Sequence, residues 1–92
     1  MIESITREEC ELQIQIWNQI IDDFMEYDLP LFCAMRGVEV VNGHICMNDW
    51  FRVQTIINEQ EFYKRGRVVQ KRLREYGYDV KMNMQTHKLT LY

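Results

Sequence analysis

The carboxylates of the first thirty residues are the side chains in this sequence with the clearest potential for chemistry. This segment holds eight acids and a single base, Arg7. A pair spaced like Asp22 and Glu26 can serve general acid–base catalysis only inside a pocket, and no pocket motif accompanies it. A row of carboxylates can also act through its charge alone. The candidates for such an acidic, partner-binding surface are Glu8, Glu11, Asp22, Asp23, Glu26 and Asp28.

The formal charge is distributed very unevenly along the chain. Residues 1–30 carry eight acids and one base, a net −7, whereas residues 31–92 carry six acids and ten bases, a net +4, so the whole chain is at −3. A separation of sign on this scale indicates a role in association.

Three interpretations of the acidic segment remain open. It is a soluble amphipathic helix face, a surface for basic segments of a partner, or an imitation of DNA phosphates. A helix rises about 1.5 Å per residue, so Asp22 and Glu26 lie about 6 Å apart along its axis, of the same order as successive phosphates on one strand.

A basic cluster within residues 62–76 is the rival feature. On an exposed helix it is a plausible phosphate-contacting surface, and flanking tyrosines can stack on bases. The other interpretations are a solvated helix face, or pairing with the acidic helix. The sequence pI near 5.3 lies far below the value above about 9 that is usual for nucleic-acid-binding domains, so we rank this function second. Its candidate residues are Lys64, Arg65, Arg67, Lys71 and Arg72, with Arg74 nearby.

Other chemistry finds little support in the residue spacing. His44 and His87 match no nucleophilic motif, and only His44 and Cys46 are close enough to suggest a metal ligand pair. The four glycines form no phosphate-binding loop. We therefore expect neither catalysis, nor a metal, nor a cofactor, nor a small-molecule substrate.

Three cysteines, an odd number, do not suggest a disulfide framework, and we expect reduced and mostly buried thiols. No apolar run approaches the roughly 18–20 residues of a membrane span, and the first residues do not have the pattern of a secretory signal. These observations predict a cytoplasmic protein without membrane contact.

The acidic segment is predicted to be one helix. Thr6 and Glu9 fit a capping box at its start, and the helix should reach about Tyr27 and stop before Pro30. Its predicted buried stripe consists of Cys10, Ile14, Trp17, Ile21 and Phe24, flanked by Ile16, Ile20, Met25 and Tyr27. The opposite, solvent-facing and base-free side is predicted to carry Glu8, Glu11, Gln15, Asn18, Asp22 and Glu26, with Asp23 nearby.

The rest of the chain predicts two hairpins separated by helical segments. Asn42-Gly43 is the favoured pair for a type I′ turn within residues 36–48, with Val38, Val40, Ile45 and Met47 on one face. Asn48 or Asp49 caps the next helix, residues 58–61 resemble a capping box at a break, and Gly77 suits the end of a helix over residues 62–76. An alternating tail with a turn near residues 85–87 forms the second hairpin. The prediction is a single α+β domain over residues 1–92, in two layers.

The length of 92, the opening MIESITREE, the acidic first helix and the closing KLTLY together resemble the Arn-like anti-restriction proteins of T-even bacteriophages. The resemblance covers the whole chain rather than a short motif. It implies a dimeric DNA mimic that binds the modification-dependent restriction nuclease McrBC in the host cytoplasm and so protects phage DNA. Seventeen Tyr, Trp, Met and Phe residues are compatible with a homodimer interface. Under this resemblance the partner is a host DNA-binding protein, and nucleic acid itself is not bound.

Overall fold

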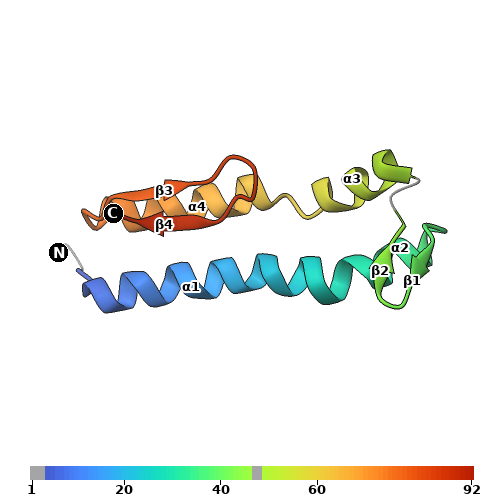
Figure 1. The fold of residues 1–92 in the computed structure, drawn as a ribbon. Coiled ribbons are helices and arrows are strands. Elements are labelled where there is room, and N and C mark those ends of the chain that lie inside the picture. Colours follow the sequence, from blue (N-terminus) through green and yellow to red (C-terminus); the bar gives the residue numbers. More distant parts are fainter. Residues whose placement is uncertain (1–3, 47–48) are drawn as a thin grey trace. The chain divides into compact units, whose positions relative to one another are not determined.

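The computed structural model describes residues 4–46 and 49–92, and it confirms the α+β class. The chain divides into two compact units (Figure 1). Unit 1 comprises Met1–Ile21 and Phe62–Tyr92, and unit 2 comprises Asp22–Glu61. The prediction of one domain over residues 1–92 stays a prediction.

Unit 1 combines most of helix α1 (Arg7–Asp23) with helix α4 (Phe62–Glu75) and the hairpin of β3 (Val80–Met82) and β4 (Leu89–Leu91). The Glu9 N–H donates to Thr6 Oγ1 at 3.1 Å, which confirms Thr6 as the cap of α1. In the antiparallel hairpin, Val80 pairs with Leu91 and Met82 with Leu89. The predicted stripe on α1 is buried, and the core of unit 1 consists of Cys10, Ile14, Trp17, Ile21, Phe62, Leu73, Val80 and Leu89.

Two adjacent residues of α1 hold the C-terminal hairpin. Trp17 packs edge-on against Phe62, with ring centroids 6.1 Å apart, and its Nε1 donates to the His87 carbonyl at 3.0 Å. The Asn18 amide donates to the Leu89 carbonyl at 2.9 Å and accepts from the Leu89 N–H at 2.8 Å. Asn18 therefore acts as a backbone partner for the free edge of β4, and its prediction as a solvent-facing residue was wrong.

Helix α4 ends as predicted at Gly77, whose φ of 96° places it in the left-handed region. The Tyr78 N–H donates to the Leu73 carbonyl at 3.4 Å and the Gly77 N–H to the Arg74 carbonyl at 2.9 Å. This is the paired pattern of a Schellman ending, and it brings the chain directly into β3.

Unit 2 contains a π-helical turn, η1 (Phe24–Asp28), helix α2 (Leu29–Met35), the hairpin of β1 (Val40–Val41) and β2 (His44–Ile45), and helix α3 (Trp50–Asn58). Its core consists of Phe24, Leu29, Cys33, Val38, Val53 and Ile56. The tight hairpin is confirmed, because Asn42 and Gly43 have φ values of 52° and 77° and Val40 pairs with Ile45. Asp49 caps α3 by accepting from the Arg52 N–H at 3.1 Å. Met47 and Asn48, named in the predictions, lie outside the described residues.

The prediction that the chain stops being helical before Pro30 was wrong. The Leu29 N–H donates to the Phe24 carbonyl, five residues earlier, and Pro30 occupies the first turn of α2. Pro30 has no N–H to donate to a carbonyl of the preceding turn, and the π-turn directly before it is where the regular hydrogen-bond pattern is interrupted. The wider π-turn is therefore the place where the helical pattern restarts, and α2 was not predicted.

The break between α3 and α4 is confirmed, but Asn58 does not cap the second helix. Asn58 is the last residue of α3, and its carbonyl accepts from the Glu61 N–H at 3.1 Å. Glu61 then has a positive φ of 54°, which turns the chain before Phe62. In the described residues no helix is long and apolar enough to cross a membrane.

Gly66 provides a test of the packing in unit 1. A Cβ at this position would lie 2.7 Å from Met82 Cε and 3.0 Å from Trp17 Cζ2. Alanine improves helix propensity by about 1 kcal/mol, but overpacking against a ring held by a hydrogen bond costs about 1–3 kcal/mol. We expect Gly66→Ala to lower the free energy of unfolding, measured with urea, by about 1 kcal/mol. Val68→Ala, on the exposed side of α4, is the control and should change it little; a gain in stability for Gly66→Ala would show that the Trp17 ring moves freely.

Candidate functional site

The two units of the structure divide the charges at different bounds from the two segments of the sequence. Unit 2 holds eight acids and two bases, a net −6 over 40 residues, whereas unit 1 holds six acids and nine bases, a net +3. The acidic character therefore belongs to residues 22–61, not only to the first thirty residues.

Both bases of unit 2 are already engaged by carboxylates. Arg36 forms a bidentate ion pair with Glu59: Nη1 lies 2.7 Å from Oε1, and Nη2 lies 2.7 Å from Oε2. Arg52 Nε lies 3.1 Å from Asp49 Oδ2, and its Nη1 donates to the Arg36 carbonyl at 2.7 Å. The hydrogen bonds between Arg36 and Glu59 raise the pKa of the Arg36 guanidinium group and lower the pKa of the Glu59 carboxyl group. Neither guanidinium group is therefore available to neutralise the other acids.

Four of the six predicted partner-binding carboxylates lie in unit 2, at the end of α1 and in η1. Asp22, Asp23, Glu26 and Asp28 all have exposed side chains. Within the described residues, Glu26 and Asp28 take part in no ion pair. We call Asp22, Asp23, Glu26 and Asp28 the acidic turn. Its spacing departs from the regular α-helical spacing assumed from the sequence, because η1 has a wider repeat.

The other two predicted carboxylates, Glu8 and Glu11, belong to unit 1. Both are exposed, but Glu11 Oε1 lies 3.5 Å from Arg7 Nε. The expectation of a base-free face along the whole helix was thus wrong at Glu11. Exposed ion pairs of this kind contribute little stability, roughly 0.3–0.5 kcal/mol, yet they reduce the local charge.

Exposed apolar side chains lie within and after the acidic turn, in η1 and α2. A hollow of about 420 Å³ in unit 2 is lined by Met25, Glu26 and Leu29, by the hairpin tip and by residues of α3. The side chains of Tyr27, Leu31 and Met35, spaced four residues apart, are 61%, 63% and 80% exposed. The prediction that four residues flank the buried stripe was wrong, because all four are exposed: Ile16 (53%), Ile20 (40%), Met25 (43%) and Tyr27 (61%). Exposed apolar surface next to charge is typical of interaction sites.

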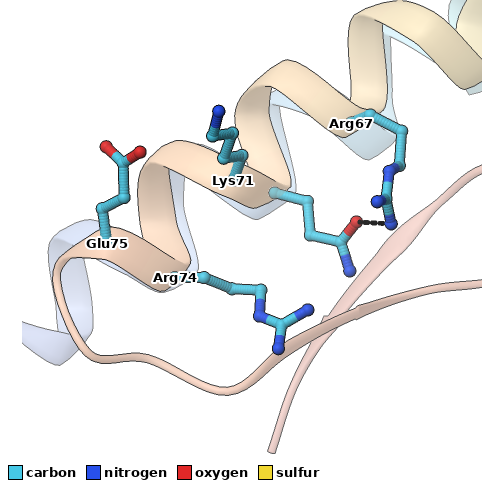
Figure 2. Close-up of a pocket in the computed structure, with 5 residues that line it drawn as sticks. Arg67, Lys71, Arg74 and Glu75 are labelled. Carbon is cyan, nitrogen blue, oxygen red and sulfur yellow. Dashed lines mark hydrogen bonds between the residues drawn. The ribbon is translucent and has the colours of Figure 1, made fainter.

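The residues of the predicted basic cluster are all exposed, but they make different contacts. Arg65 lies over the Trp17 and Phe62 rings, 5.5 and 5.7 Å from their centroids. Arg72 Nη2 donates to Gln13 Oε1 at 3.3 Å, toward α1. Arg67, Lys71 and Arg74 line a hollow on α4 (Figure 2). Lys64 is exposed and does not line this hollow.

The histidines and cysteines differ in their surroundings. The His87 ring packs against Tyr63 at 5.8 Å, and His44 is exposed at the start of β2. All three cysteines are free, and burial raises the pKa of Cys10 and of Cys33, which disfavours the nucleophilic thiolate. No group of three potential metal ligands occurs in the described part of the chain.

Two polar residues that hydrogen-bond to the C-terminal hairpin, Asn18 and Gln70, were not predicted from the sequence. Asn18 binds β4, and Gln70 is buried to all but 6% of its surface. A signal existed for Gln70, because it lies four residues after Gly66 and three before Leu73, on the buried face of α4. No comparable signal marks Asn18.

The chain matches no protein-family model, and comparisons with curated proteins and with solved structures found no match.

The Arg36–Glu59 pair gives a pH-dependent prediction. Glu59 has a lowered pKa, so the stability it contributes is present above its unfolded-state pKa and is lost as the pH falls through the folded value. We expect carbon-detected NMR titration to show a Glu59 pKa below the usual glutamate range, and Arg36→Gln to raise it. Arg7→Gln, which removes a base in unit 1, is the control and should leave it unchanged. An unaltered Glu59 titration in Arg36→Gln would contradict the pairing.

Proposed function

We propose that this protein is a non-enzymatic inhibitor that presents a DNA-like acidic surface to a host DNA-binding protein. The observation that carries the proposal is the charge of unit 2, eight acids against two bases, with both bases held by Glu59 and Asp49. The acidic turn is the part of this unit most suited to contact a partner.

The physical basis is the electrostatic term of DNA binding. DNA-binding surfaces gain much of their affinity from contacts between basic side chains and phosphates, with release of counterions. Exposed carboxylates on a rigid turn offer the same attraction but present no base edges, so they occupy such a surface without regard to its sequence preference. Binding by this mechanism weakens as the salt concentration rises.

The resemblance to Arn-like proteins suggests the target. Under this proposal the partner is the modification-dependent restriction nuclease McrBC, and occupying its DNA site protects phage DNA in the host cytoplasm. A homodimer with two-fold symmetry would double the negative charge on one particle. The exposed apolar side chains at Tyr27, Leu31 and Met35 are compatible with such a contact.

The alternative is a nucleic-acid-binding regulator that uses Lys64, Arg65, Arg67, Lys71 and Arg72. Arg65 and Arg72 contact Trp17 and Gln13 within unit 1. Because these two bases are engaged and the sequence pI is near 5.3, we rank the alternative second.

Neutralising the acidic turn tests the proposal. In a competition assay, increasing protein should displace fluorescent duplex DNA from purified McrBC. We expect the triple variant Asp22→Asn, Asp23→Asn, Glu26→Gln to compete about tenfold or more weakly at low salt, with a smaller dependence on salt. A matched variant with three neutralised acids of unit 1, Glu9→Gln, Glu75→Gln and Asp79→Asn, should compete nearly as well as the wild type.

Two results would contradict the proposal. Equal competition by the acidic-turn variant and the wild type would remove the role of these carboxylates. Direct binding of the protein to duplex or single-stranded DNA in a gel-shift titration, weakening with salt, would favour the regulator instead.

A further inference from the structure

The hollow on α4 in unit 1 has a chemistry that DNA mimicry does not use. It has a volume of about 360 Å³ and is lined by Arg67, Gln70, Lys71, Arg74 and Glu75. Three bases and one acid give it a net charge of +2, and its size falls within the roughly 300–1,000 Å³ of small-molecule sites. In the described residues, none of these charged groups forms an ion pair within 4 Å.

Gln70 is the buried residue of this hollow, and it holds the Arg67 side chain in place. It is 6% exposed, and its Nε2 donates to the Val80 carbonyl at 2.8 Å. That bond determines which way the amide points, so that Oε1 accepts from Arg67 Nη1 at 3.0 Å. A buried amide of a helix thus anchors one guanidinium group to β3 through a chain of two hydrogen bonds. Holding a long side chain in this way lowers the entropy lost when it binds a ligand.

The two arginines can act together. Figure 2 shows Arg67 and Arg74 extending toward the same side of α4, whereas Lys71 and Glu75 point to another side. Arg67 and Arg74 are seven residues apart, about 10 Å along a helix, which two long side chains can bridge around a group lying between them. Lys71 and Glu75 are one turn apart, so their opposite charges partly compensate.

We propose that this hollow binds the diphosphate group of a small ligand, with one phosphoryl group held by Arg67 and the other by Arg74. A guanidinium group offers a planar pair of N–H donors that matches a phosphoryl group, and two such groups suit two phosphoryl groups. The net charge of +2 compensates the charge of the ligand. Arg65 and Arg72 contact Trp17 and Gln13, and Arg67 itself lies over the Tyr63 ring at 6.0 Å, so the second arm of the experiment below decides between a small diphosphate and a nucleic-acid strand.

Isothermal titration with sodium pyrophosphate tests this site on the full chain. We expect saturable one-to-one binding, weakened about tenfold or more by Arg67→Gln and by Arg74→Gln, as for the loss of one charge-assisted hydrogen-bonding group. Lys64→Gln removes the same charge from an exposed position of α4 outside the hollow, and should change the affinity less than about twofold if contact, not distant charge, dominates. Circular dichroism and thermal melting confirm that each variant is folded.

A second arm separates the sources of the phosphate. A nucleoside diphosphate should bind at least as tightly as pyrophosphate, and an oligonucleotide without terminal phosphates should bind more weakly. The proposal is overturned if pyrophosphate does not bind, if Lys64→Gln weakens binding as much as Arg67→Gln, or if the oligonucleotide binds more tightly than the nucleoside diphosphate. All these variants lie in unit 1, so this outcome is independent of the acidic turn.

Discussion

A hairpin of two strands is at best marginally stable in water, and this constraint governs how both units are built. Each unit contains one such hairpin and must support it with helices. In unit 1 the support comes from adjacent residues of α1, with Trp17 bound to the turn and Asn18 bound to the edge of β4. Gln70 adds a third bond from α4 to β3. Polar side chains, and not a third strand, therefore satisfy the backbone groups that a small sheet leaves unpaired.

The basic side chains of the two units make different kinds of contact. Unit 2 uses its two guanidinium groups to fasten local structure, where Arg36 reaches Glu59 and Arg52 bonds both Asp49 and the Arg36 carbonyl. These contacts join the end of α2 to α3. The remaining acids are left to the solvent side of η1 and the loops. Unit 1 places its bases differently, over aromatic rings, against amides and around a hollow. The opposite net charges of the units thus follow from their composition, with two bases in unit 2 and nine in unit 1.

Local signals predicted much of this fold. Thr6, Asn42-Gly43, Asp49 and Gly77 act through the backbone within a few residues, and each has the role expected from its type. The buried stripe on α1 was also predictable, because helical periodicity depends on few neighbours. The failures concern contacts between distant segments. In the sequence, Asn18 falls on the predicted solvent-facing side of its helix. Its hydrogen bond with Leu89 of β4, 71 positions later, is seen only in the structure. The six carboxylates were identified as exposed, but their division between two units and the pairing of Glu11 with Arg7 depend on the tertiary structure.

The π-turn of η1 has a consequence for how this chain tolerates changes in length. A π-turn is equivalent to an α-helix with one residue inserted, and the insertion here falls between the carboxylates at Asp22 and Asp23 and the buried residues Leu29 and Cys33. Deleting one residue from this segment would restore the regular repeat, and because the wide turn absorbs the extra residue, the helix on both sides would keep its orientation. Leu29 and Cys33 would then follow the buried Phe24 by four and eight residues, the spacing of one face of an α-helix. The five-residue turn thus lets Leu29 and Cys33 share the buried side with Phe24 although they follow it by five and nine residues.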